Sequence, residues 1–182
     1  MKTDEWGAVT YDLCFGGVFY ALVDADQLGL TIVPENAREI ATKGAALRNL
    51  IAAASDVRHP TSPALDGLAY VMFRSDDPDG AIQTCTTLRP GRADRSPCVA
   101  QDRMPTWPCA MRRAQHGDIL ISRSIIGGEL TTEFLRETQI GPYPATQNRI
   151  SGQCWIHAIT QIGLDPTDPF PTGFTLSDTW GG

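Results

Sequence analysis

One long helical pattern constrains the fold of this chain more than any other feature of its sequence. Pro34 suits the first position of a helix, and Glu35 complements the N-terminal helix dipole. Apolar residues then recur close to the 3.6-residue helical period, at Ala37, Ile40, Ala41, Leu47, Leu50, Ile51 and Ala54. We therefore expect a long helix over residues 34–54 that packs one apolar face against another layer.

The rest of the sequence consists of short apolar runs separated by Gly, Pro and Asp, a pattern typical of strands and turns. Strands are predicted at residues 8–13, 18–23, 68–73, 81–88, 119–122, 129–137, 145–150 and 154–159. The Gly16-Gly17 pair predicts a turn between the first two strands, and residues 76–80 predict a hairpin between the next two. The fold class is therefore α/β, with the helix on a mostly antiparallel sheet, and 182 residues fit a single domain over residues 1–182.

Composition excludes several classes of function. The net charge is −6 and the Lys and Arg residues are scattered, so nucleic acid is not an expected partner. The first six residues are polar or charged apart from Met1 and Trp6, and no segment approaches the ~20 apolar residues of a membrane span. Five cysteines form an odd, widely spaced set, which favours reduced thiols and a cytoplasmic location.

Residues 94–98, Asp-Arg-Ser-Pro-Cys, form the sharpest local signal for chemistry. A cysteine that follows a rigid Ser-Pro turn can stand at the start of a helix, where backbone N–H groups stabilise a thiolate and bind an anion. On the residues alone, the alternatives are a buried free cysteine for Cys98 and a turn-capping aspartate for Asp94.

Further motifs resemble those of the proline racemase family. Residues 12–24, DLCFGGVFYALVD, resemble the family pattern D-(I/L)-x-(Y/F)-G-G-x-F-(F/Y)-x-x-V-D. Residues 94–98 match a highly specific signature of this family. His59-Pro60, residues 124–127, residues 150–152 and residues 165–174 also follow in the family's order. The resemblance covers nearly the whole chain and is broken only around residues 99–110.

This resemblance implies a fold like that of diaminopimelate epimerase. In that fold, two α/β domains each wrap a barrel-like sheet around a central helix, and the active site lies between them. The present chain is similar to the C-terminal half. The family needs no cofactor or metal, and the implied substrate is an imino acid, proline or hydroxyproline. A homodimer is compatible with the resemblance.

The same resemblance implies roles for three residues. Cys98 matches the second catalytic acid/base, and Asp94 matches the residue that accepts a hydrogen bond from the ring nitrogen of the substrate. Tyr70 falls where hydroxyproline epimerases carry a ligand-binding histidine. Inverting an α-carbon requires a base on one face and an acid on the other, so Cys98 is one half of a pair of thiols.

Two departures from the family predict that the chain is inactive as it stands. The Met-Cys-Gly-His type motif that carries the first catalytic cysteine is absent. Gly-Thr-Gly is also absent after Cys98, where the family begins its central helix. Pro105 and Pro108 stand there instead, and each proline inside a helix costs about 3 kcal/mol.

Codon arithmetic offers an explanation for the second departure. A shifted reading frame over this stretch can encode Gly-Thr-Gly and then forces two alanines, at Met104-Pro105 and Trp107-Pro108. We therefore expect a local frame shift after Cys98 that is restored near Met111.

Three other readings compete with this one. In the trans-3-hydroxyproline dehydratase branch the second cysteine is typically replaced by threonine, so Cys98 argues against it. A non-catalytic remnant would at most bind a partner through the surface that its missing half would cover. A zinc site could draw on Cys98, Cys109, His116, Cys154 and His157, but no C-x-x-C pair exists and metal is not expected.

Overall fold

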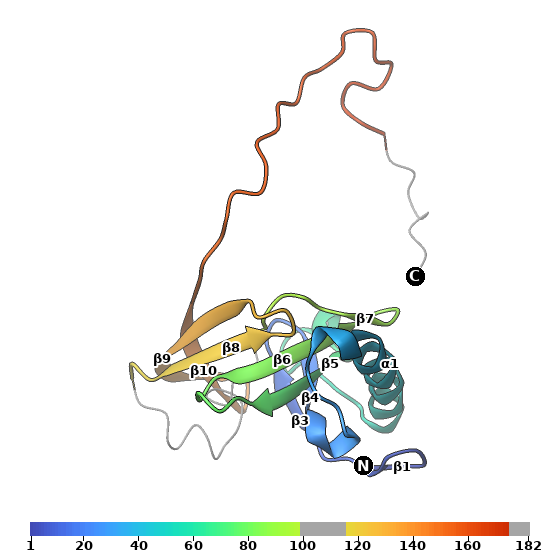
Figure 1. Ribbon diagram of the computed structural model, residues 1–182, viewed down its shortest axis with the longest axis vertical. Coiled ribbons are helices and arrows are strands. Elements are labelled where there is room, and N and C mark those ends of the chain that lie inside the picture. Colours follow the sequence, from blue (N-terminus) through green and yellow to red (C-terminus); the bar gives the residue numbers. More distant parts are fainter. Residues whose placement is uncertain (99–115, 175–182) are drawn as a thin grey trace.

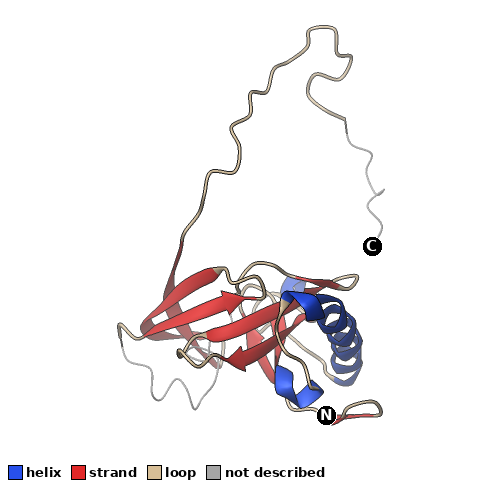
Figure 2. Cartoon of the chain, viewed as in Figure 1, coloured by secondary structure: helices blue, strands red, loops and turns tan. Residues whose placement is uncertain are grey.

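The computed structural model of the protein describes residues 1–98 and 116–174, which form a curled sheet, a long helix and an extended C-terminal segment (Figures 1 and 2). The strands are β1 (Lys2–Thr3), β2 (Gly7–Ala8), β3 (Asp12–Phe15), β4 (Phe19–Asp24), β5 (Leu68–Asp76), β6 (Ile82–Leu88), β7 (Arg92–Ala93), β8 (Ile119–Ser124), β9 (Glu129–Ile140) and β10 (Tyr143–Gly152). The helix is α1 (Ala37–Ala54), and short 3₁₀ turns lie at Ala25–Leu28, Pro34–Asn36 and Pro63–Leu65.

The main sheet has eight strands in the order β10-β9-β8-β6-β5-β4-β3, with β7 paired to β6. The pairs β4·β5 and β6·β8 are parallel, and the other neighbours are antiparallel. Helix α1 connects the parallel strands β4 and β5, as a crossover between parallel strands requires. The predicted mixture of one long helix and a mostly antiparallel sheet is therefore confirmed.

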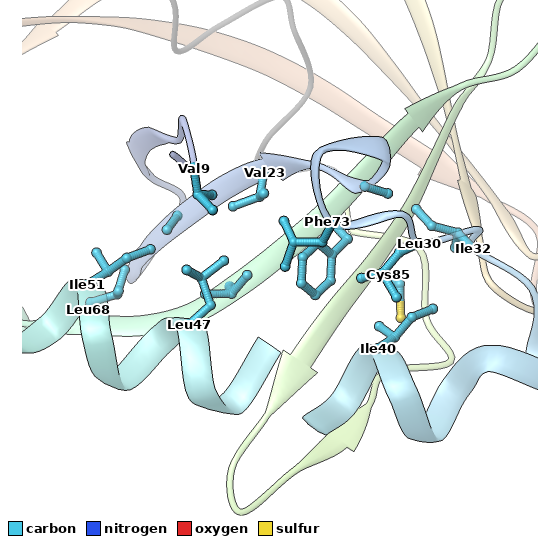
Figure 3. Close-up of a cluster of buried hydrophobic side chains, with 14 of the residues drawn as sticks. Val9, Val23, Leu30, Ile32, Ile40, Leu47, Ile51, Leu68, Phe73 and Cys85 are labelled. Carbon is cyan, nitrogen blue, oxygen red and sulfur yellow. The ribbon is translucent and has the colours of Figure 1, made fainter. Parts of the chain in front are cut away.

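Alternation along the strands produces two apolar layers, one on each face of the sheet. Phe73 of β5 faces α1, where it packs with Ile40, Leu47 and Ile51 of the helix (Figure 3), and Val71 belongs to the same cluster. The intervening residues of β4 and β5 pack in a second cluster on the opposite face, which contains Cys14, Tyr20, Leu22 and Met72, with Val18, Tyr70 and Cys98 against them. This second layer carries the candidate chemistry.

Helix α1 lies unusually close to the sheet at Gly44. A Cβ atom there would clash with the Oγ1 and Cγ2 atoms of Thr87. Thr87 cannot move away easily, because it is buried and its hydroxyl donates a hydrogen bond to the carbonyl of Val71 at 3.0 Å. The glycine in the middle of the helix therefore serves the packing of helix on sheet.

The sheet curls until its two edge strands face each other, which gives the expected half-barrel shape. Leu13 and Phe15 of β3 and Tyr143 and Ile150 of β10 line one groove of about 640 Å³. The helix that the family resemblance predicts inside this curl follows Cys98 directly. That helix, the two prolines and the suspected frame shift all lie outside the described residues.

Most sequence predictions for individual elements are confirmed within small shifts. The expected helix forms as the 3₁₀ turn Pro34–Asn36 followed by α1, and β5 and β6 form the expected hairpin. The predicted strand over residues 8–13 instead begins at Asp12, because the side chain of Gln27 takes both backbone hydrogen bonds of Thr10. The N–H of Thr10 donates to Gln27 Oε1, and Gln27 Nε2 donates to the carbonyl of Thr10.

One predicted strand is wrong. Residues 154–159 form no strand, and Trp155 and Ile156 are 78% and 86% exposed rather than part of the core. An alternating apolar pattern becomes a strand only where a neighbouring backbone can pair with it, and the segment after β10 runs away from the sheet (Figure 1). No helix in the described part of the chain is long and apolar enough to cross a membrane.

Candidate functional site

The segment 94–98 is attached to the sheet through its backbone and through a local turn. Strand β7 pairs with β6, and the N–H of Asp94 extends this pairing with a 2.8 Å bond to the carbonyl of Thr86. The carboxylate of Asp94 accepts a 3.0 Å hydrogen bond from the backbone N–H of Ser96. Asp94 thus forms the turn that sequence reasoning offered as the alternative to a ligand-binding role.

A buried pair of hydroxyls holds the backbone of Cys98 to the neighbouring strands. Ser122 of β8, which is fully buried, donates a 3.0 Å hydrogen bond from its hydroxyl to the carbonyl of Cys98. The same hydroxyl lies 3.3 Å from that of Thr84 on β6. Pro97 packs beside Gly128 in the turn before β9. A Cβ atom at Gly128 would lie 3.6 Å from the proline ring.

The thiol of Cys98 lies at the edge of the second apolar cluster. It is half-buried and packs against the group formed by Cys14, Tyr20, Leu22 and Met72. Burial raises the pKa of Tyr20 in this cluster well above its ordinary value, and its neighbour Cys98 raises it further. Cys98 is therefore neither deep in an apolar core nor fully exposed.

Tyr70 adjoins the same cluster from β5. Its ring lies 5.4 Å from that of Tyr20, with the two planes inclined at 47°. Tyr70 also lines a groove of about 680 Å³ together with Arg48 and Arg89. Asp94 and Cys98 are not among the residues that line this groove.

The structure thus brings Cys98 and Tyr70 together through a residue that sequence reasoning did not single out. Tyr20 lies 78 positions before Cys98 in the chain, and Ser122 lies beyond the broken stretch of the resemblance. Strand register places Tyr20 opposite both Cys14 and Tyr70, while packing and the Ser122 hydrogen bond bring Cys98 to this group. No local sequence motif could have indicated them.

None of the four described cysteines forms a disulfide, and their surroundings differ. Cys85 is fully buried against α1, and burial, followed by the charge of Asp94, raises the pKa of its thiol to about 12. Cys14 is buried in the second cluster, whereas Cys154 is exposed on the C-terminal segment. Cys98 combines partial exposure with fixed polar neighbours, which distinguishes it among these four.

The histidines and acidic residues show no metal-binding arrangement in the described ranges. No group of three or more His, Cys, Asp or Glu side chains that could hold a metal ion occurs among residues 1–98 and 116–174. His59 lies in a loop, where its ring packs 4.7 Å from that of Phe15 and its Nδ1 accepts the N–H of Ser62 at 3.0 Å. His116 is exposed, and Cys109 lies outside the described residues.

A family comparison decides what kind of chain carries this site. Residues 1–175 match the proline racemase family. The chain belongs to the proline racemase family. It is 47% identical over 182 residues to 4-hydroxyproline 2-epimerase 1 of Rhizobium rhizogenes and 46% identical to the 4-hydroxyproline 2-epimerase of Allorhizobium ampelinum.

These alignments cover 100% of the racemase-family chain but only 53% and 52% of the two relatives. The chain therefore spans about half the length of the curated relatives that it matches. The resemblance inferred from the motifs is confirmed at the level of the family.

Solved structures of the proline racemase family agree with the fold. A probable proline racemase from Agrobacterium radiobacter with bound carbonate and a hydroxyproline epimerase from Agrobacterium vitis with bound trans-4-OH-L-proline both superpose with a TM-score of 0.79 at 45% identity. They cover 100% of this chain, which corresponds to 54% and 52% of those proteins. The curled sheet is thus the fold of one half of such a protein.

Proposed function

We propose that this chain is the Cys98-bearing half of a cofactor-independent proline or 4-hydroxyproline racemase or epimerase, and that it does not turn over substrate by itself. The observation that carries the proposal is the position of Cys98 in a chain of this family. Its carbonyl accepts a hydrogen bond from the buried Ser122, and its half-buried side chain packs against the cluster that contains Tyr20.

Cys98 would act as one of two proton carriers. A thiolate on one face removes the α-proton of the imino acid and becomes a thiol, while a thiol on the other face donates its proton to the α-carbon and becomes a thiolate. The configuration inverts, one proton enters as one leaves, and the two sulfur atoms exchange protonation states. Cys98 provides one of these carriers, and the other belongs to a first half that this chain does not contain.

The substrate class is an imino acid. The hydroxyproline epimerase from Agrobacterium vitis has trans-4-OH-L-proline bound, and the curated relatives are named 4-hydroxyproline 2-epimerases. Asp94 would accept the hydrogen bond of the ring nitrogen in exchange for its bond to Ser96, and Tyr70 would contact the ring from β5. Because Tyr70 replaces the histidine expected in hydroxyproline epimerases, proline itself belongs in the substrate class.

Further features of the proposal follow from the family and the composition. We propose a cytoplasmic protein with reduced thiols, an imino-acid ligand and a homodimeric assembly, and neither nucleic acid nor a membrane as a partner. The dehydratase alternative is not proposed, because Cys98 stands where that branch typically has threonine.

The proposed catalytic inactivity of the isolated chain has two causes. The chain lacks the Met-Cys-Gly-His type motif that carries the first catalytic cysteine of this family, and losing one proton carrier removes a factor of about 10² to 10⁴ in rate. It also has no Gly-Thr-Gly after Cys98, and such glycines let backbone N–H groups approach a carboxylate. Loss of carboxylate positioning multiplies the first loss.

The test is incubation of the purified chain with L-proline and with trans-4-hydroxy-L-proline in deuterated water, followed by proton NMR of the α-position. We expect no exchange above that of a sample without protein. Exchange that disappears in Cys98→Ser would contradict the proposed inactivity, although it would support the assignment of Cys98.

A further inference from the structure

The groove that contains Arg48 and Arg89 lies at one end of the sheet, where β5 begins and β6 ends. Its volume of about 680 Å³ falls within the range of about 300–1,000 Å³ that is usual for small-molecule sites. Arg48 reaches it from α1, and Arg89 from the turn after β6. We call it the arginine groove. Tyr70 lines it as well, but Cys98 does not.

The guanidinium of Arg48 is held in one orientation. Its Nε and Nη2 atoms donate hydrogen bonds to the carbonyl of Leu68 at 3.1 and 2.7 Å, and its Nη1 atom donates one to the side-chain oxygen of Asn49 at 3.3 Å. These acceptors are neutral, so they orient the guanidinium without balancing its charge. Because a guanidinium has five N–H donors, three bonds leave donors for a ligand.

The acidic residue of the groove does not neutralise the two arginines. The carboxylate of Asp66 accepts hydrogen bonds from the backbone N–H of His59 at 2.7 Å and from Arg58 at 3.0 Å. These two bonds, the first more than the second, lower the pKa of Asp66. In the described part of the chain, no ion pair joins Arg48 or Arg89 to a carboxylate.

This local positive charge contrasts with the chain as a whole. The net charge of −6 means that anions are not attracted to the protein in general. An anion that binds at the arginine groove therefore does so through local contacts. Apolar side chains complete the lining, among them Val18, Leu65 and Leu88, and apolar walls with a few placed polar groups are typical of small-molecule sites.

We propose that the arginine groove binds the oxyanion of a small molecule, a carboxylate or a phosphate group, with Arg48 as the oriented donor and Arg89 as the second cation. The planar fork of a guanidinium matches the geometry of both oxyanions. The inference goes beyond the proposed function, which assigns no role to either arginine. It also does not depend on Cys98. The competing interpretation is that both arginines are solvated surface charges.

The experiment is a titration of the ¹⁵N-labelled chain, followed by NMR of the Arg48 Nε–H group and of the backbone amides of Gly67 and Leu68, which line the groove. The probes are inorganic phosphate and acetate, each at constant ionic strength. Sodium chloride is the control for screening of surface charge. The amide of Gly29, which is not part of the groove lining, is the reference signal.

We expect saturable shifts at the three groove groups with phosphate, with acetate or with both, and none at Gly29. The anion with the lower Kd identifies the oxyanion, so the two titrations distinguish a phosphate from a carboxylate ligand. Sodium chloride should produce only small shifts that increase linearly with its concentration.

Variants separate the groove from other arginines. Arg89→Gln should raise the Kd about tenfold, because it removes a charge-assisted contact from an exposed position. Arg48→Lys keeps the charge but removes the fork, and should also raise the Kd. The matched control is Arg38→Gln on the same helix, which is exposed and not part of the groove lining, and should leave the Kd unchanged. Thermal melting confirms that each variant folds.

Three results would overturn the proposal. Shifts that do not saturate, or that chloride reproduces, would show that the anions only screen surface charge. Equal Kd values for Arg89→Gln and Arg38→Gln would show that the groove has no special role. The absence of any shift with both anions would exclude a small oxyanion and would direct attention to an acidic side chain of a protein partner. The proposed role of Cys98 is tested separately, by substrate turnover.

Discussion

At the scale of single residues, the candidate site depends on buried hydroxyls that hold a loop to a sheet. Ser122 donates a hydrogen bond to the carbonyl of Cys98, and Tyr20 belongs to the cluster against which Cys98 packs. Asp94, which the family resemblance assigns to the substrate, is engaged in a turn with Ser96. The site as it stands is therefore organised around Cys98 more than around Asp94.

Replacing Ser122 by Ala should destabilise the protein by about 1–2 kcal/mol, because it leaves a half-buried carbonyl without its donor. The measurement is the free energy of unfolding in urea. Ser96→Ala in the same segment is the control, since Ser96 is exposed and surface substitutions usually stay within ~0.5 kcal/mol. Equal effects of the two substitutions would show that the Ser122 contact contributes nothing specific.

At the scale of elements, one arginine ties together three parts of the sheet. The guanidinium of Arg123 on β8 forms ion pairs with Asp77 and Asp79 in the β5–β6 turn and with Glu129 at the start of β9. Two hydrogen bonds lower the pKa of the Asp79 carboxyl. The larger effect comes from the bond donated by Arg123, and the next from the bond donated by the backbone N–H of Ala81. Ion pairs thus link the turn between β5 and β6 to strands β8 and β9.

A carboxyl with a lowered pKa in the folded state stabilises the protein above its unfolded pKa, about 3.9, and this contribution is lost as the pH falls through the lower folded value. Arg123→Gln should therefore lower the urea midpoint at pH ~7 and have little effect near pH ~2. Arg136→Gln is the control, because Arg136 bonds the neutral side chain of Gln147 at 2.7 Å. A loss of the same size at both pH values would contradict this account of the Arg123 contacts.

Elements were predicted correctly from the sequence where a local pattern of apolar residues or turn residues determines them. The helix over residues 34–54 and the hairpin around residues 76–80 follow from the spacing of apolar residues and from turn chemistry. The strand over residues 154–159 was wrong, because a strand also needs a partner that the pattern does not reveal. Tyr20 and Ser122 escaped notice since their link to Cys98 arises only from strand register and packing.

At the scale of the whole molecule, the C-terminal segment is exposed along its described length. Trp155, Ile156, Ile159 and Ile162 are each more than three-quarters exposed, and Figure 2 shows the segment leading away from the sheet. Contiguous exposed apolar surface of this kind marks an interaction site or an aggregation hazard. This exposed segment belongs to a chain that spans about half the length of its curated relatives.

The central claim is that Cys98 is one of two proton carriers in a protein of twice this length. Its most direct test joins the chain to the half of the Rhizobium rhizogenes 4-hydroxyproline 2-epimerase that it does not match, with Gly-Thr-Gly and a helix-compatible sequence restored after Cys98. The measurement is α-deuteration and epimerisation of trans-4-hydroxy-L-proline and L-proline in deuterated water. We predict turnover that falls by a factor of about 10² to 10⁴ in Cys98→Ser and is unchanged in Cys154→Ser, the exposed cysteine. Turnover that survives Cys98→Ser, or a folded fusion that leaves both imino acids unchanged, would contradict the account.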